Sequence, residues 1–233
     1  MRERSLRKTR VIATIIRLLE QSLIRVGSDE YAKENESYGL STLKNRHARV
    51  KGDELIFQFR GKSGIYHAIK ITDARVVRTV KRCQDLPGQR LFQYYDETDQ
   101  LRDVRSEDVN EYIQQVIGPS FSTKYFRTWA GSAFALSILS RRDHPNSKRQ
   151  SRQEITRAIK EVAQVLGNTP AVCRKSYIHP AILEEFAKGG LTPPKTSVRQ
   201  LLSRSGLSFP ERELFRFLRR IRRGASLSSR VHQ

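Results

Sequence analysis

The hydrophobic period of the chain changes twice along its length, and this change constrains the fold more than any other feature. Apolar residues in 11–26 recur at intervals of three and four, which is typical of one buried helix face. Residues 54–60 and 65–71 are strand-like instead, and two glycines within 61–64 favour a hairpin turn between them. The sequence therefore predicts a helix followed by an antiparallel hairpin, with 47–50 as a candidate third strand.

Helical patterns return in most of the remaining chain. Thr169-Pro170 and His179-Pro180 each place a capping side chain before a proline, which is typical of a helix start. The polar, basic stretch 141–152 reads as a connection. The predicted fold is mainly α with a small antiparallel β-sheet (α+β). We expect the later helices at 73–83, 106–117, 122–140, 152–166, 169–177, 180–188 and 211–222.

The charge of the chain points to a polyanionic partner. Its 44 Lys and Arg residues against 24 Asp and Glu give a formal net charge of +20. Such an excess bears on partners more than on fold, and nucleic acid is the first candidate. Basic residues are concentrated in 141–160 and 191–233, which we expect to contact a phosphate backbone.

Several classes of protein are excluded by what the sequence lacks. No run approaches the roughly 20 apolar residues of a membrane span, and the charged N-terminus has no signal core. Cys83 and Cys173 cannot form a disulfide framework or a zinc site, which fits a reducing compartment. No nucleotide-binding P-loop, HExxH or GxSxG motif is present, so any phosphate chemistry must proceed without a bound triphosphate.

Two segments are candidates for such chemistry. Arg127 lies in an apolar helical stretch, where a charge needs a partner: either an internal carboxylate or a bound phosphate. Tyr177 follows a short basic stretch that contains Arg174 and Lys175. Neither signal is specific alone, because most tyrosines and buried arginines are structural.

Four segments together resemble the type IB DNA topoisomerases, in particular the compact branch of poxviruses and bacteria. They occur in the family's order and span roughly 22–185. They are SLIRVGSDEYAKENESYGLSTLKNRH (22–47), FRGKSG (59–64), KYFRTWAGS (124–132) and GNTPAVCRKSY (167–177).

The resemblance implies a tyrosine recombinase/type IB topoisomerase-like catalytic domain that relaxes supercoiled DNA without ATP, metal or another cofactor. Tyr177 would attack a phosphodiester and form a transient 3′-phosphotyrosyl link. Arg25 and Arg127 would donate to the non-bridging phosphate oxygens, and Lys62 would protonate the 5′-oxygen leaving group. Lys124, Arg174 and Lys175 are possible DNA contacts.

Asn168 completes the implied catalytic set and distinguishes two branches of the family. Poxvirus enzymes carry histidine at this position, whereas bacterial members carry asparagine. Its amide retains a donor for a phosphate oxygen but not a proton-transfer role. The residue therefore favours the bacterial branch, and with it a cytoplasmic location at the nucleoid.

The resemblance also predicts the domain organisation and partners. We expect a catalytic domain at 1–190, with the small sheet and Lys62 hairpin at about 46–71 within a helical body. We expect the basic segment 191–233 to be part of this domain or appended to it, and the family's β-rich N-terminal clamp domain to be absent. The expected partner is double-stranded DNA, bound by a monomer with no obligate protein partner and no membrane association.

Two alternatives stay open at this point. A tyrosine site-specific recombinase uses the same kind of nucleophile and arginine pair, although Lys124-x-x-Arg127 in place of His-x-x-Arg favours the topoisomerase. A non-catalytic basic DNA-binding protein would have similar charge but no need for the set Arg25, Lys62, Arg127, Asn168 and Tyr177.

Overall fold

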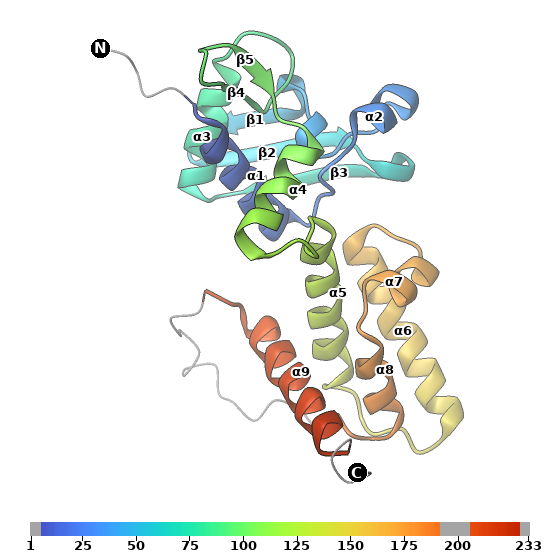
Figure 1. The fold of residues 1–233 in the computed structure, drawn as a ribbon. Helices are drawn as coiled ribbons and strands as arrows, with labels where there is room; N and C mark the ends of the chain where they lie inside the picture. Colours follow the sequence, from blue (N-terminus) through green and yellow to red (C-terminus); the bar gives the residue numbers. More distant parts are fainter. Residues whose placement is uncertain (1–5, 192–205, 229–233) are drawn as a thin grey trace. The chain divides into compact units, whose positions relative to one another are not determined.

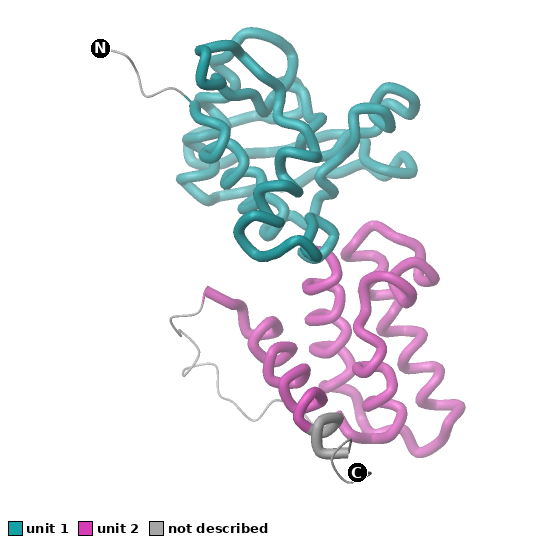
Figure 2. The backbone as a smooth tube through the Cα atoms, in the orientation of Figure 1, with its two compact units in different colours: residues 1–126 teal, residues 127–233 magenta. Residues whose placement is uncertain are grey.

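The computed structural model describes residues 6–191 and 206–228, which form two compact units (Figures 1 and 2). Unit 1 comprises residues 1–126 and unit 2 comprises 127–233. Within the described residues, the structure is mainly helical with small antiparallel sheets, which confirms the predicted fold class. The predicted extent of the catalytic domain, 1–190, stays a prediction.

Unit 1 is built on the predicted hairpin and third strand. The strands pair in the antiparallel order β1-β2-β3, with Phe57 opposite both Ala48 and Ile69. Alternate residues of β2 face the core, because successive side chains of a strand point to opposite faces. The three strands are β1 (Ala48–Lys51), β2 (Glu54–Arg60) and β3 (Tyr66–Ile71).

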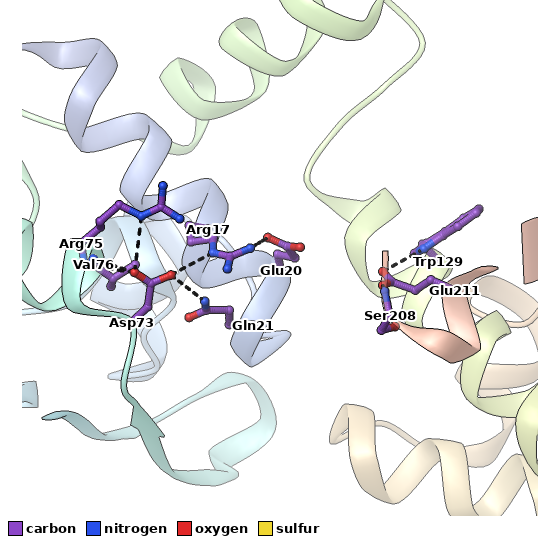
Figure 3. Close-up of polar contacts among 9 residues, drawn as sticks. All are labelled: Arg17, Glu20, Gln21, Asp73, Arg75, Val76, Trp129, Ser208 and Glu211. Carbon is purple, nitrogen blue, oxygen red and sulfur yellow. Dashed lines mark hydrogen bonds and ion pairs between the residues drawn. The ribbon is translucent and has the colours of Figure 1, made fainter. Parts of the chain in front are cut away.

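Three helices of unit 1, at Lys8–Ser22, Ala74–Gln84 and Ser106–Ile117, bury one continuous apolar core with this sheet, whereas the helix at Asp29–Asn35 has no buried residue. Asp73 caps the third helix by accepting hydrogen bonds from the backbone N–H groups of Arg75 and Val76. The same carboxylate accepts from Arg17 and Gln21, each at 3.1 Å, and so ties the first helix to the third (Figure 3). The four helices are α1 (Lys8–Ser22), α2 (Asp29–Asn35), α3 (Ala74–Gln84) and α4 (Ser106–Ile117).

The first helix ends earlier than the sequence predicts. We expected a helix over 11–26, but α1 ends at Ser22, and Leu23 adopts the left-handed conformation with φ 56°. The backbone at Arg25 and Val26 pairs instead with residues 40–41. Arg25 therefore lies outside the helix, in the segment that connects α1 to α2.

A second hairpin in unit 1 was not predicted. It joins β4 (Gln93–Tyr95) to β5 (Leu101–Asp103), and Asp96 organises its turn by accepting from the N–H groups of Thr98 and Gln100. Strands of three residues carry too few side chains for the alternating pattern to be detected in a sequence.

The described residues of unit 2 form helices without strands. Thr169 and His179 cap their helices before Pro170 and Pro180, as predicted. The sixth helix begins at Lys148, so the last part of the predicted connection 141–152 is helical; Ser147 caps it by accepting from the N–H of Gln150. The helices are α5 (Lys124–Leu139, which begins in unit 1), α6 (Lys148–Leu166), α7 (Pro170–Ser176), α8 (Pro180–Ala187) and α9 (Phe209–Ser228).

The basic segment 191–233 is only partly described. Residues 192–205 and 229–233 lie outside the described residues, whereas α9 extends beyond both ends of the helix expected at 211–222. No helix in the described ranges combines the length and apolar character that crossing a membrane requires.

Candidate functional site

Arg25 is positioned by a close crossing of two backbone segments in unit 1. Its carbonyl accepts from the N–H of Leu40 at 2.9 Å, and the carbonyl of Val26 accepts from Ser41 at 2.7 Å. A Cβ atom at Gly39 would lie 2.5 Å from the Cα of Gly27 and 2.6 Å from the Arg25 carbonyl oxygen. Only glycine allows this approach, so Gly39 fixes the path of the chain at Arg25.

Lys62 lies on the exposed turn between β2 and β3. The turn is closed by a hydrogen bond of 2.7 Å from the N–H of Gly61 to the carbonyl of Ile65. Ser63 and Gly64 both have positive φ, which suits the predicted glycine-containing turn. The lysine ammonium group is 5.3 Å from the centre of the Tyr31 ring, an attractive cation–π contact.

One hollow of about 440 Å³ in unit 1 is lined by both Arg25 and Lys62. Tyr31 and Tyr38 also line it, and Glu30 and Glu34 contribute carboxylates. The structure therefore brings together two of the predicted catalytic cations, although 37 positions separate them in the sequence.

Arg127 is buried in unit 2, with 5% of its surface exposed. Its Nη2 donates to the carbonyl of Leu166 at 2.5 Å, at the end of α6. Its guanidinium carbon lies 5.2 Å from the centre of the Tyr177 ring. The structure thus places Arg127, which is predicted to bind phosphate, directly against the ring of Tyr177, the predicted nucleophile. Because the site is buried, few water molecules can screen the arginine's charge.

The backbone of Tyr177 is held by two α5 residues that the sequence analysis did not single out. The hydroxyl of Ser132 donates to the Tyr177 carbonyl at 3.3 Å and accepts from the N–H of His179 at 3.0 Å. A Cβ atom at Gly131 would lie 2.6 Å from that carbonyl oxygen, so a larger residue would displace the tyrosine segment. The small residues Gly131 and Ser132 within KYFRTWAGS were the sequence feature that could have indicated this contact, because small side chains on a helix permit close approach of another backbone segment.

Asn168 lies at the junction of α6 and α7, two residues after the carbonyl that binds Arg127. Gly167 ends α6 in the left-handed conformation, and the N–H of Asn168 donates to Ala163 at 3.0 Å. Thr169 then caps α7. This junction fixes the backbone on both sides of the asparagine, whose predicted role stays a prediction.

The three predicted DNA contacts are exposed. Lys124 opens α5, and Arg174 and Lys175 lie in the last turn of α7, close in sequence to Tyr177. In 141–160, by contrast, Arg142 forms ion pairs with Glu154 and Glu161 at 3.0 and 2.7 Å. These pairs reduce the positive charge that 141–160 presents to a polyanion.

Both cysteines are buried, and burial raises the pKa of the Cys83 thiol to about 12. Neither is therefore a candidate nucleophile. Among the described residues, no three His, Cys, Asp or Glu side chains are grouped so that they could hold a metal ion.

The sequence also matches a known family over most of its length. The family described as eukaryotic DNA topoisomerase I, catalytic core, matches residues 1–195. The chain belongs to the type IB DNA topoisomerase family. The matched region is longer than the span of roughly 22–185 that the four similar segments cover, but it does not include residues 196–233.

The curated relatives of this topoisomerase-family chain are viral proteins. It is 32% identical over 186 residues to DNA topoisomerase 1B of Acanthamoeba polyphaga mimivirus, covering 77% of this chain and 55% of the relative. It is 27% identical over 164 residues to the monkeypox virus DNA topoisomerase I and to the vaccinia virus (strain Western Reserve) DNA topoisomerase 1B, covering 69% of this chain and 49% of each relative. The chain thus spans about half the length of these relatives, and the expected bacterial branch has no support from them.

Proposed function

We propose that this chain relaxes supercoiled duplex DNA by cutting and resealing one strand through Tyr177, as a monomer and without ATP or metal. The observation that carries the proposal is the contact between the buried Arg127 guanidinium and the Tyr177 ring, at 5.2 Å. Membership of the type IB family and the hollow shared by Arg25 and Lys62 support it.

In the proposed first step, the Tyr177 oxygen attacks a DNA phosphorus and loses its proton to water. A phosphorus–tyrosyl oxygen bond forms at the 3′ side, and the bond from phosphorus to the 5′-oxygen breaks. Lys62 gives a proton to that departing oxygen, which leaves as a 5′-hydroxyl. The cut strand then swivels, and the reverse reaction reseals it.

Stabilisation of the transition state is assigned to the two arginines and to Asn168. Negative charge accumulates on the non-bridging phosphate oxygens, where guanidinium groups offer planar, paired donors. Arg127 is held by the Leu166 carbonyl before DNA binds, so little reorganisation is needed at that donor. The phosphotyrosyl link conserves the energy of the broken bond, which accounts for a reaction without ATP.

The test uses the 233-residue chain with negatively supercoiled plasmid, in EDTA and without ATP. We expect relaxation by the parent chain and none by Tyr177→Phe. Tyr94→Phe, which removes a hydroxyl from β4, is the matched control and should relax DNA normally. Failure of the parent chain to relax plasmid or form a covalent adduct at any salt concentration would refute the proposal.

A second assay separates the alternatives. DNA labelled at its 5′ end should become attached to the protein, because the link is to the 3′ side of the break, whereas a label downstream of the break should be released. Strand exchange between two specific sites without relaxation would indicate a recombinase. Binding without any adduct would indicate a non-catalytic DNA-binding protein.

A further inference from the structure

Helix α9 presents a regular row of arginines that no part of the proposed reaction uses. It contains six arginines and two glutamates. Arg212, Arg216, Arg219 and Arg223 follow one another at intervals of four, three and four, so they share one helix face. We name these four residues the α9 arginine row. All but Arg212 are exposed.

The opposite face of α9 is already occupied by the protein core. Leu214 is completely buried and Phe217 is 7% exposed, and both lie across the helix from the arginine row. A basic amphipathic helix that binds a membrane needs a free apolar face to insert. Since that face is buried here, the row favours a soluble polyanion over a lipid surface.

The N-terminal end of α9 is fixed to the helix that carries Arg127. The indole N–H of Trp129 donates to Glu211 at 3.0 Å, and the same carboxylate accepts from the N–H and hydroxyl of Ser208 at 2.7 and 2.6 Å (Figure 3). Trp129 follows Arg127 by two residues on α5. A ligand held by α9 is therefore coupled to the helix of the catalytic arginine.

The dimensions of the row suit a phosphate backbone. At about 1.5 Å per residue, Arg212 to Arg223 span roughly 16 Å along the helix. Duplex DNA carries about one negative charge per 1.7 Å of its axis, so several phosphates lie within that length. Arg216 is paired with Glu213 at 2.5 Å, and the Arg219 guanidinium carbon lies 5.6 Å from the Phe215 ring centre. Both contacts leave long side chains on the exposed face.

We propose that the α9 arginine row binds the phosphate backbone of the duplex on which Tyr177 acts. It is a binding surface outside the region that matches the family, 1–195. The proposal rests on the proposed function for its choice of duplex DNA. The proposal predicts that the affinity for duplex DNA falls as salt rises. The affinity should not depend on base sequence, because phosphate contacts carry no direct sequence information.

The test measures non-covalent duplex binding at several salt concentrations, in the full chain carrying Tyr177→Phe. The variant changes Arg216, Arg219 and Arg223 to Gln. Removing one arginine–phosphate ion pair lowers the slope of log affinity against log salt by about 0.9, so we expect a decrease of about 1 to 2.7. A second variant changes only Arg219 and Arg223, which leaves the Glu213 ion pair intact.

Two controls separate direct phosphate binding from net charge and from folding. Changing Arg75, Arg78 and Lys81 to Gln removes the same charge from exposed positions of α3 and should leave the slope unchanged. Changing the three α9 arginines to Lys keeps the charge and should preserve the slope. Thermal unfolding by circular dichroism confirms that each variant is folded.

An unchanged slope in both α9 variants overturns the proposal, as does an equal decrease in the α3 control. Loss of binding to vesicles of anionic phospholipid, with duplex binding unchanged, would assign the row to a membrane and also overturns it. The parent chain with Tyr177 is assayed in parallel for a covalent adduct. An adduct with an unchanged slope refutes only the α9 proposal, whereas a lowered slope without any adduct supports α9 and refutes the proposed function.

Discussion

The predicted catalytic side chains of unit 2 are buried or half-buried and fixed by contacts, whereas Lys62 of unit 1 is exposed and less constrained. In unit 2, Arg127 is buried, bonded to the Leu166 carbonyl and packed against the Tyr177 ring. In unit 1, the Arg25 backbone is fixed by the glycine crossing, but Lys62 lies on an exposed turn. One set of groups is thus preorganised, and the other contains a long side chain that must lose rotamer freedom when it binds.

This difference separates two kinds of catalytic contribution. A donor that stabilises developing charge gains most from being fixed before the reaction begins. A general acid needs only to reach the leaving oxygen when the bond breaks. It is not needed at all when the leaving group can depart without a proton. The two units should therefore respond differently to substitution.

The largest effect is expected at Arg127. Arg127→Ala removes a paired phosphate donor and should slow single-turnover cleavage by about 10³-fold. Arg127→Lys should recover little, because an ammonium group lacks the planar fork. Arg25→Lys, in the more open hollow, should retain more activity than Arg127→Lys. Quenched-flow measurement of adduct formation checks this order, and equal losses for the two lysine variants would remove the distinction between the units.

Lys62→Ala should slow cleavage by about 10²-fold or more, as expected for loss of a general acid. A substrate in which sulfur replaces the 5′-bridging oxygen should restore most of the rate, because a thiolate departs without protonation. Lys44→Ala is the matched control, since Lys44 also lies over a tyrosine ring, at 5.9 Å from that of Tyr38. If the sulfur substrate rescues Lys62→Ala no more than the control, Lys62 does not act as the acid.

Gly131→Ala and Gly39→Ala test the backbone supports of the two units. A Cβ at position 131 would meet the Tyr177 carbonyl oxygen at 2.6 Å and displace the proposed nucleophile, with an expected loss of about 10²-fold in cleavage rate. Gly39→Ala should destabilise the fold by about 1–3 kcal/mol, but with a smaller rate loss, because the long Arg25 side chain can adjust. Gly52→Ala is the control for the rate: its φ of 58° strains an added side chain, but nothing lies within 4 Å of the new Cβ, so the cleavage rate should be unchanged. The reverse order of rate losses would mean that unit 1 is the less tolerant unit.

Local patterns predicted the parts of the fold that depend on neighbouring residues. The β2–β3 hairpin follows from strand periods on either side of a glycine turn, and the starts of α7 and α8 follow from Thr169 and His179 before proline. Local patterns singled out Arg127 and Tyr177 without assigning them a role. The family resemblance, not periodicity, assigned those roles and added Arg25, Lys62 and Asn168. The structure brings Arg25 to Lys62 and Arg127 to Tyr177, each pair within its own unit.

Long-range contacts account for what the sequence did not predict. The end of α1 depends on pairing with residues 40–41, and the positions of Gly131 and Ser132 matter because Tyr177, 45 residues after Ser132, packs there. The sequence offered Arg127 a carboxylate or a phosphate as partner. The structure shows a backbone carbonyl and an aromatic ring, neither of which has a sequence pattern of its own.

The smallest expected effect is that of His47, which acts on stability and not on the reaction itself. Its protonation should make the stability of unit 1 depend on pH. Burial, together with the charges of Arg46 and Lys44, lowers the pKa of His47 from 6.5 to about 4. Its ring packs against Tyr38, which lines the hollow of Arg25, and its Nδ1 accepts from the N–H of Lys44 at 3.1 Å. The neutral imidazole is therefore the form that the folded unit 1 accommodates.

The sign of the pH effect follows from the lowered pKa. Above pH 6.5 the histidine is neutral in both states, whereas below it the unfolded chain binds a proton that the folded chain resists. The unfolding free energy should therefore decrease as pH falls from 6.5 to about 4, by at most about 3 kcal/mol. Hydrogen exchange of unit 1 peptides should show the loss, and fluorescence of Trp129, the single tryptophan, follows unit 2. His47→Gln should weaken the pH dependence of unit 1 exchange, whereas His144→Gln, at an exposed position, should not. If the parent and His47→Gln show the same pH dependence, another group destabilises unit 1 in acid.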